Sequence, residues 1–227
     1  MKPLVITDVP RPDLEVVEHL RDAGSATVHE ALGQTGLMHS RLRPSLPGTC
    51  IAGTAVTVLT QPGDNLMIHV AVEQCRDGDI LVVVPLSESR DGYIGELLAT
   101  ALAHRGVQGV VIEGGYRDAG TLAGMRFPVW SLGAWGRGTR KERLGAVNVP
   151  VVCGGVLVAP GDAVVADDDG VAVVPRTELS AVLPRVLDRV GRERQTRERL
   201  GKGEISLDIY NLRPKLAALG LEYRRHG

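Results

Sequence analysis

The spacing of hydrophobic residues predicts a mixture of helices and strands along the first third of the chain. Apolar residues recur at helical spacing over residues 12–23, and a second short helix is expected over residues 25–33, with Ser25 as its cap. Residues 46–60 are rich in β-branched residues and bounded by Pro-Gly, which predicts a strand. Residues 64–75 again fit a helix.

A regular alternation follows. Val- and Ile-rich runs at residues 79–85, 109–114 and 128–132 predict strands, and they are separated by helical patterns over residues 95–106 and from about Asp118. Continuous apolar strands between helices are typical of a parallel sheet that is buried on both faces. This part of the chain therefore predicts an α/β fold.

The pattern changes after residue 149. Residues 149–175 form a succession of short apolar runs with Pro-Gly-Asp and Asp-Asp-Asp-Gly turns, so a β-rich half is expected to pack on the α/β half. Asp167, Asp168 and Asp169 are interpreted as a hairpin turn rather than a cation site. We expect one domain over residues 1–176 and a helical extension over residues 177–227. The charged second half of that extension indicates either contact with a neighbouring subunit or a solvated face.

Charge and cysteine content narrow the function classes. The 26 basic and 27 acidic residues give a net charge of −1, so nucleic acid and membrane are not expected partners. The four lysines lie outside long apolar stretches, which disfavours imine chemistry. Cys50, Cys75 and Cys153 are expected to be buried thiols in a reducing compartment. Without a signal-like N-terminus or an apolar run of roughly 18 residues, a soluble, cytoplasmic protein is expected.

One short segment contains candidate catalytic and ligand-binding residues. The sequence lacks the phosphate-loop, dinucleotide, nucleophile-elbow and HExxH motifs, but EGGYRDAG (residues 113–120) directly follows an apolar strand. Gly114 and Gly115 would let the backbone approach a ligand, and Arg117 and Asp118 would lie where ligands bind in open α/β sheets. Arginine can grip a carboxylate or enolate, and aspartate can bind a divalent metal. The alternative is that Asp118 caps the next helix and Arg117 pairs with a surface acid.

A helix start in the preceding unit adds a second element. The amides of Gly95, Glu96, Leu97 and Leu98 would be unpaired donors in the first turn, and such amides form an anion site. They could face the same small carboxylate as Arg117. The alternative is an ordinary helix start, with Glu96 placed favourably for the helix dipole.

These residues carry a family resemblance. Glu96, twenty residues, and then Arg117-Asp118 resembles the acid-x20-Arg-Asp signature of the superfamily that contains 4-hydroxy-4-methyl-2-oxoglutarate/4-carboxy-4-hydroxy-2-oxoadipate aldolases and the regulator of ribonuclease E activity A. The resemblance runs through nearly the whole chain, and the tail SLDIYNLRPKLAALGLEY looks like the aldolase branch. It implies a layered β-sandwich flanked by helices, of the swivelling β/β/α type, assembled as a trimer or hexamer.

The resemblance also implies an activity: metal-dependent cleavage of a 4-hydroxy-2-oxo acid to pyruvate and a second 2-oxo acid. Asp118 would bind Mg or Mn, Arg117 would contact the 2-oxo group, and the amides of residues 95–98 would hold the carboxylate. Glu193 from an adjacent subunit would orient water at the metal. Two positions depart from the usual pattern, Glu96 where aspartate is frequent and Thr121 where an acid is frequent, and both bear on the positioning of water.

Breaking the C3–C4 bond of such a substrate leaves a pyruvate enolate, which a metal and Arg117 can stabilise without a lysine. The same enolate arises when oxaloacetate loses carbon dioxide, so decarboxylation is expected as a side activity. Two rivals remain: a protein-binding regulator of a ribonuclease, and a dedicated oxaloacetate decarboxylase. His69 is interpreted first as a core residue. The basic loop of residues 135–145 is interpreted as solvated, with attraction of a second carboxylate or an RNA as the alternative.

Overall fold

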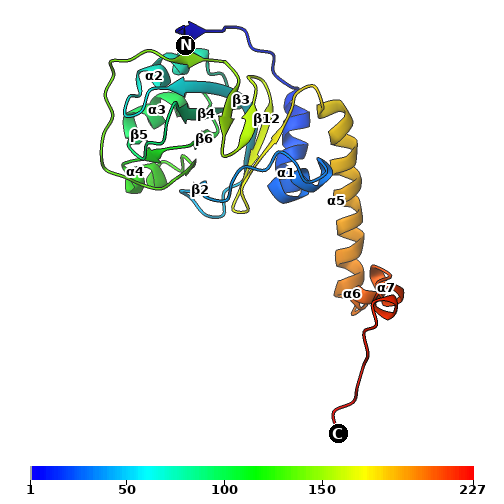
Figure 1. The fold of residues 1–227 in the computed structure, drawn as a ribbon. Coiled ribbons are helices and arrows are strands. Elements are labelled where there is room, and N and C mark those ends of the chain that lie inside the picture. The colour runs from blue at the N-terminus through cyan, green and yellow to red at the C-terminus, as the bar shows by residue number, and fades with distance from the viewer. Residues whose placement is uncertain (1) are drawn as a thin grey trace. The chain divides into compact units, whose positions relative to one another are not determined.

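A computed structural model describes residues 2–227 of the chain. By its internal contacts the chain divides into two compact units, one ending at Val186 and the other spanning Leu187–Gly227. The first unit is a mixed α/β structure with a central sheet flanked by helices (Figure 1). None of the helices within residues 2–227 has both the length and the apolar character needed to cross a membrane.

The chain order of the elements interleaves strands and helices. The helices are α1 (Leu14–Ala31), α2 (Leu66–Gln74), α3 (Glu96–His104), α4 (Ala119–Gly124), α5 (Leu179–Gly201), α6 (Ser206–Ile209) and α7 (Arg213–Ala218). The strands are β1 (Leu4–Val5), β2 (Arg43–Pro44), β3 (Ile51–Thr60), β4 (Asp79–Pro85), β5 (Gly92–Ile94), β6 (Gly109–Ile112), β7 (Gly115–Tyr116), β8 (Val129–Ser131), β9 (Ala146–Val147), β10 (Val151–Cys153), β11 (Val156–Val158), β12 (Ala163–Ala166) and β13 (Val171–Val174).

Strand β3 is the centre of the main sheet. On one side β4, β6 and β8 follow it in parallel, and β2 closes this edge antiparallel to β8. On its other side β3 pairs antiparallel with β12 near its start and with β9 near its end. The predicted parallel strands and the β12–β13 hairpin of the β-rich half are therefore parts of one nine-stranded sheet, while β10 and β11 form a separate two-stranded sheet.

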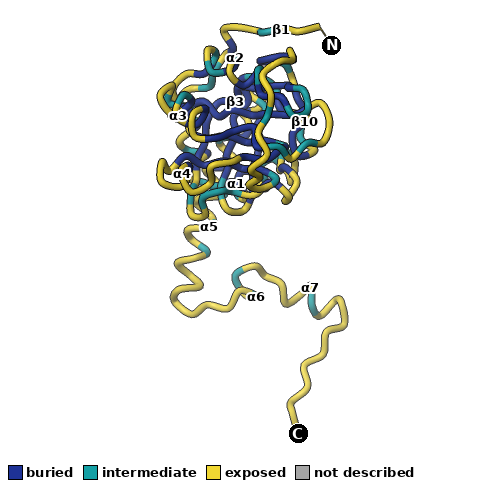
Figure 2. Tube along the Cα trace, turned by 90° about the vertical axis from the view of Figure 1, so that its left-hand side faces the viewer, coloured by how far each residue is buried: buried dark blue, intermediate teal, exposed yellow. Residues whose placement is uncertain are grey.

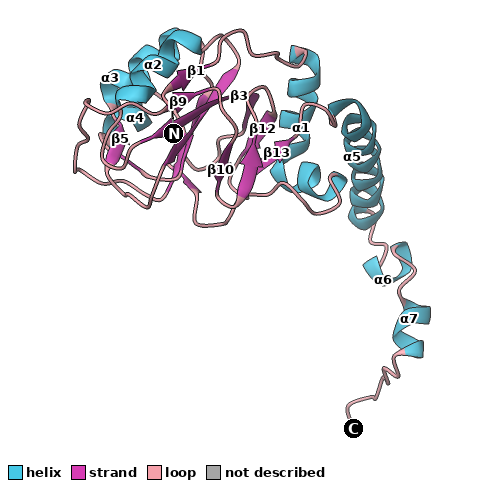
Figure 3. Cartoon of the chain, turned by 45° about the horizontal axis from the view of Figure 1, so that its top comes forward, coloured by secondary structure: helices cyan, strands magenta, loops and turns pink. Residues whose placement is uncertain are grey.

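The parallel strands are buried on both faces because alternate side chains enter different cores. One face packs against α2, α3 and α4, which Figure 3 shows gathered on the same side of the sheet. The other face packs against the β10–β11 hairpin and against β12 and β13. The strand residues that point to the helical side are Val56, Val58, Leu81, Val83, Val110 and Ile112, and those that point to the other side are Ala55, Leu59, Ile80, Val82, Val84 and Val111.

A third core joins α1 and the start of α5 to β12 and β13. The two helices expected over residues 12–23 and 25–33 are confirmed as two helical segments within α1, separated at Gly24, whose φ of 80° and ψ of 162° are not helical. Ser25 does not act as a simple cap: its amide and hydroxyl both donate to Asp167, at 2.7 and 2.5 Å. Asp167 also accepts from the amides of Asp169 and Gly170, so the expected hairpin turn is confirmed.

Two local expectations were wrong. The strand expected from residue 46 begins only at Ile51, after the turn that contains Gly48 (φ 79°). Cys75 and Cys153 are buried, and burial raises the pKa of each thiol to about 12. Cys50 is instead exposed, because it precedes the buried part of β3.

The second unit contains most of α5 together with α6 and α7. Every residue from 187 to 227 is exposed or only partly buried (Figure 2). Along α5 the charged side chains pair at i,i+4 spacing: Asp188 with Arg192, Arg189 with Glu193, and Arg194 with Glu198. Because none of these residues is buried, this segment has no core of its own, and exposed ion pairs of this kind add little stability.

A buried ion pair ties the N-terminal segment to the sheet. The Arg11 guanidinium donates to both oxygens of Asp79, at 2.8 and 2.7 Å, and the Asp79 side chain is 1 % exposed. We expect Arg11→Ala to lower the free energy of unfolding by roughly 1.5–3 kcal/mol, because it leaves a buried carboxylate without its charged donor. Arg76→Ala, which removes an exposed pair with Asp8, is the control in urea denaturation. Equal effects of the two substitutions would contradict the expectation.

Candidate functional site

Two short parallel strands bring the candidate residues together. β5 pairs with β7, with Gly92 opposite Gly115 and Ile94 opposite Tyr116. The amide of Arg117 donates to the carbonyl of Ile94 at 2.8 Å. The start of α3 and the Arg117-Asp118 pair therefore lie side by side, as the sequence predicts.

Asp118 turns toward α3 and not toward its own helix. It occupies the N-cap position of α4, yet its side chain makes no capping bond there. Its Oδ2 accepts from the amide of Glu96 at 3.0 Å and lies 3.6 Å from Nε of Arg117. The simple capping role is thus not what the geometry shows. Among the amides expected to hold a substrate carboxylate, that of Glu96 already donates to Asp118. The amides of Leu97 and Leu98 lie in the first turn of α3, where backbone amides have no partner within the helix.

The backbone at this point has an uncommon conformation. Asp118 has φ 58° and ψ 38°, in the left-handed region, which aspartate and asparagine tolerate better than most residues. Gly95 faces it so closely that an added Cβ would lie 2.5 Å from Oδ2 of Asp118 and 2.9 Å from Nε of Arg117. The carboxylate and the guanidinium, 39 % and 46 % exposed, therefore occupy the space left by a missing side chain.

A small cavity of about 120 Å³ opens beside Arg117. It is well below the roughly 300–1,000 Å³ of sites for drug-sized ligands, so it fits a small molecule. Its lining residues include Asn65, His69, Gly95, Leu97, Leu98, Arg117, Thr139 and Lys141. The cavity is thus lined by residues from the start of α3, from α2 and from the basic loop.

Two lining side chains have unusual electrostatics. Asn65 is buried, and its amide nitrogen donates to the carbonyl of Tyr93 at 3.0 Å, but its Oδ1 has no protein donor. Burial, with a smaller contribution from Lys141, lowers the pKa of His69. Both effects favour the uncharged form of the imidazole.

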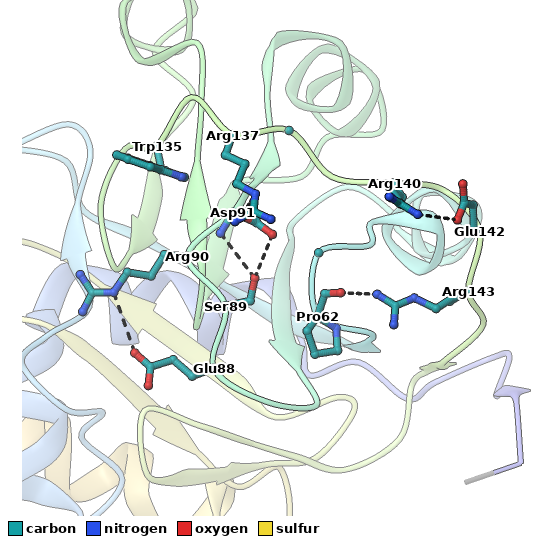
Figure 4. Close-up of a pocket in the computed structure, with 12 residues that line it drawn as sticks. Pro62, Glu88, Ser89, Arg90, Asp91, Trp135, Arg137, Arg140, Glu142 and Arg143 are labelled. Atoms are coloured by element: carbon teal, nitrogen blue, oxygen red, sulfur yellow. Dashed lines mark hydrogen bonds and ion pairs between the residues drawn. The ribbon is translucent and has the colours of Figure 1, made fainter.

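A larger and more open hollow of about 1140 Å³ is lined by Asp91, Trp135 and the arginines at positions 90, 137, 140 and 143, among others (Figure 4). Its arginines come with acidic neighbours: Arg137 lies 3.3 Å from Asp91, and Arg140 lies 3.6 Å from Glu142. Arg90 and Glu88 form a looser pair at 4.0 Å. The positive charge of the basic loop is therefore largely compensated, which does not favour the RNA alternative.

Asp64 anchors this loop at the start of α2. Its buried carboxylate accepts from the amides of Leu66, Glu142 and Arg143. Burial alone would raise its pKa, but the three amides and the charge of Arg143 outweigh burial, and the net pKa is lowered. A lowered folded pKa means that the stabilisation is present above the unfolded value near 3.9 and is lost as pH falls through the folded one.

The remaining predicted residues lie as follows. Glu193 is on α5, in the second unit, where Oε1 is 2.9 Å from Nε of Arg189. Gly115 allows close backbone packing, because an added Cβ would lie 2.2 Å from the carbonyl oxygen of Arg90. The approach of a ligand to Gly114 and Gly115 stays a prediction. Sequence reasoning missed Asn65 and Asp64, whose only signal is their place after the Pro62-Gly63 turn.

The residues fit a weakly held hard cation. Residues 2–227 contain no cluster of three or more His, Cys, Asp or Glu side chains able to cage a metal. Asp118 offers a partly exposed carboxylate, and oxygen ligands completed by water and substrate suit Mg²⁺. A thiolate or imidazole site of the zinc type is not present in this part of the chain.

Comparison with known proteins gives matches in both sequence and structure. A sequence model of the family described as "RraA-like: Aldolase/RraA" matches residues 25–173. A Halalkalibacterium halodurans protein named "Putative 4-hydroxy-4-methyl-2-oxoglutarate aldolase" is 28 % identical over 76 % of this chain and 82 % of its own. A Burkholderia multivorans protein of the same name is 34 % identical over 63 % and 87 %. The structure of Streptomyces coelicolor RraAS2, titled an unusual member of the RNase ES inhibitor RraA family, superposes with a TM-score of 0.74 at 30 % identity, covering 84 % of this chain and 99 % of that one.

Proposed function

Because this chain belongs to the RraA-like aldolase/RraA family, we propose that it cleaves a 4-hydroxy-2-oxo acid to pyruvate and a second 2-oxo acid. The observation that carries the proposal is the Asp118 carboxylate, which turns away from its own helix and lies with Arg117 against the first turn of α3. The carboxylate accepts from the first amide of α3, so it caps the neighbouring helix and not its own. The side chain is still 39 % exposed, which leaves it accessible to a cation.

Each residue has a role in this proposal. Arg117 binds the 2-oxo oxygen and stabilises the charge that develops there as the C3–C4 bond breaks. The first-turn amides of Leu97 and Leu98 bind the substrate carboxylate. Asp118 holds Mg²⁺ or Mn²⁺, which when bound polarises the 2-oxo group.

The electron balance of the reaction is simple. A base removes the 4-hydroxyl proton, the C3–C4 electron pair moves to form the pyruvate enolate, and C3 is then protonated. Glu193 of a neighbouring copy is proposed to orient the water that takes part in these transfers, in a trimer or hexamer. The small cavity suits the pyruvyl half of the substrate, and 4-hydroxy-4-methyl-2-oxoglutarate and 4-carboxy-4-hydroxy-2-oxoadipate are the proposed substrates.

Metal removal tests the proposal. We expect EDTA to lower the rate of pyruvate release by about 100-fold or more, because the loss of a Lewis acid removes several kcal/mol of transition-state stabilisation. Added Mg²⁺ or Mn²⁺ should restore the rate, and pyruvate is measured by coupling to NADH oxidation. Full activity in EDTA after exhaustive dialysis would contradict the proposal.

The Streptomyces relative is described as a member of a family of RNase ES inhibitors, which supports a second candidate function, that of a protein-binding regulator of a ribonuclease. This candidate predicts that a pull-down captures a ribonuclease and that neither hydroxy-oxo acid yields pyruvate. The third candidate function is a dedicated oxaloacetate decarboxylase, whose reaction passes through the same pyruvate enolate. It is distinguished from the aldolase by comparing the specificity constants for oxaloacetate and the hydroxy-oxo acids on one preparation.

A further inference from the structure

We infer that Asp64 is a positioning residue: it clamps the loop of residues 137–143 as a wall of the small cavity and so holds Arg117 in place. The catalytic consequence rests on the proposed function, but the clamp itself does not. The loop joins β8 to β9 and carries Thr139 and Lys141, which both line the cavity.

The clamp is a fully buried carboxylate with three backbone donors. Oδ2 of Asp64 accepts from the amides of Glu142 at 2.8 Å and Arg143 at 3.1 Å, and Oδ1 accepts from the amide of Leu66 at 3.0 Å. The side chain is 0 % exposed. One carboxylate thus joins the start of α2 to the end of the loop.

Further backbone bonds align the loop along the same segment. The amide of Asn65 donates to the carbonyl of Arg140 at 2.9 Å, and the amide of Arg140 donates to the carbonyl of Gly63 at 2.8 Å. Figure 4 shows Arg140 and Arg143 on this stretch, with Arg143 reaching the carbonyl of Pro62. The side chains of the loop itself are exposed or only partly buried, so packing does not hold it.

The other end of the loop reaches the candidate catalytic arginine. The amide of Gly92 donates to the carbonyl of Arg137 at 2.7 Å. A Cβ on Gly138 would lie 3.0 Å from Nη1 of Arg117, so the loop backbone passes directly beside the guanidinium. Between these two anchors the loop fixes one side of Arg117.

An aspartate suits this task better than its amide. All three partners are N–H donors, and ordering an exposed loop costs conformational entropy that these bonds must offset. Asparagine would place an NH₂ group against at least one donor. Asp64→Asn removes at least one of the three bonds and the negative charge that strengthens the others, while nearly preserving side-chain volume. We therefore expect it to loosen the loop.

Limited trypsin digestion of the full chain tests the clamp, because the loop offers cleavage after Arg137, Arg140, Lys141 and Arg143. We expect cleavage in this loop to be at least about 10-fold faster in Asp64→Asn than in the wild type, as mapped by mass spectrometry. Cleavage at the exposed arginines of residues 187–227 is the internal reference and should not change.

Asp162→Asn is the matched control. Asp162 is also buried and accepts two backbone amides, from Ala159 and Arg176, but neither donor belongs to the loop. A second test variant, Glu142→Pro, deletes one donor from the exposed side and leaves the buried carboxylate intact. It should raise cleavage after Arg137, Arg140 and Arg143, and by less than Asp64→Asn does. The bond after Lys141 is left out of this comparison, because trypsin does not cut before proline.

Activity gives the second readout. We expect the KM for the hydroxy-oxo acid to rise about 10-fold in Asp64→Asn and to stay within about two-fold of the wild type in Asp162→Asn. If neither loop variant is cut faster in the loop than Asp162→Asn, the inference is overturned. If the loop opens as expected but the wild type forms no pyruvate, the proposed function fails and the clamp stands.

Discussion

Asp118→Asn is expected to lower kcat/KM for pyruvate release by about 100-fold or more while the protein stays folded. Asparagine keeps an oxygen that can accept from the amide of Glu96 and tolerates the left-handed backbone, so the local structure should persist. What it loses is the negative charge that holds the cation and faces Arg117. Losses of about 10²–10³ are typical when one group that stabilises developing charge is removed.

The control for this substitution is Asp8→Asn. Asp8 also has a left-handed backbone, at φ 56°, and it is an exposed aspartate that pairs with Arg76. Its variant should retain full activity. Binding of Mn²⁺ to each protein, followed by electron paramagnetic resonance, separates loss of the cation from loss of turnover. Wild-type Mn²⁺ binding and activity in Asp118→Asn would contradict the assignment.

Gly95→Ala is the second large effect that we expect. The backbone of Gly95 is extended, so alanine is allowed there, but its methyl group would lie 2.5 Å from Oδ2 of Asp118 and 2.9 Å from Nε of Arg117. Both side chains would have to move. We expect kcat/KM to fall by about 100-fold, since small misplacements of catalytic groups have effects of this size.

Gly120→Ala controls for the general effect of adding a methyl group. Gly120 lies in α4, close in sequence to the same site, and nothing lies within 4 Å of its added Cβ. Alanine should leave activity unchanged and slightly stabilise the helix. Comparable activity in the two glycine variants would show that the contact between α3 and Asp118 is not needed.

The sequence predicted the sheet well, because burial on both faces leaves a direct trace. Val- and Ile-rich runs such as residues 79–85 stay apolar at every position only when both faces are covered. The adjacency of the α3 start and Arg117 also followed, because the ends of neighbouring parallel strands meet at one edge. The spacing of residues along the chain was enough to predict both the sheet and this adjacency.

Hydrogen bonds between residues far apart in the sequence could not be predicted from local patterns. Asp167 bonds Ser25 across 142 positions, and Asp64 bonds Arg143 across 79. Neither aspartate has a periodic signal, because each acts through backbone amides that any residue can offer. The packing role of Gly115 was also not predicted, because its close neighbour is the carbonyl of Arg90, 25 positions earlier in the chain.

The measurement that tests the central claim most directly is pyruvate formation by one metal-loaded preparation from three substrates: 4-hydroxy-4-methyl-2-oxoglutarate, 4-carboxy-4-hydroxy-2-oxoadipate and oxaloacetate. We expect the specificity constant for at least one hydroxy-oxo acid to exceed that for oxaloacetate by about 10-fold, a difference of roughly 1.4 kcal/mol in transition-state binding. No pyruvate from either hydroxy-oxo acid, or a clear preference for oxaloacetate, would contradict the assignment of this chain as an aldolase.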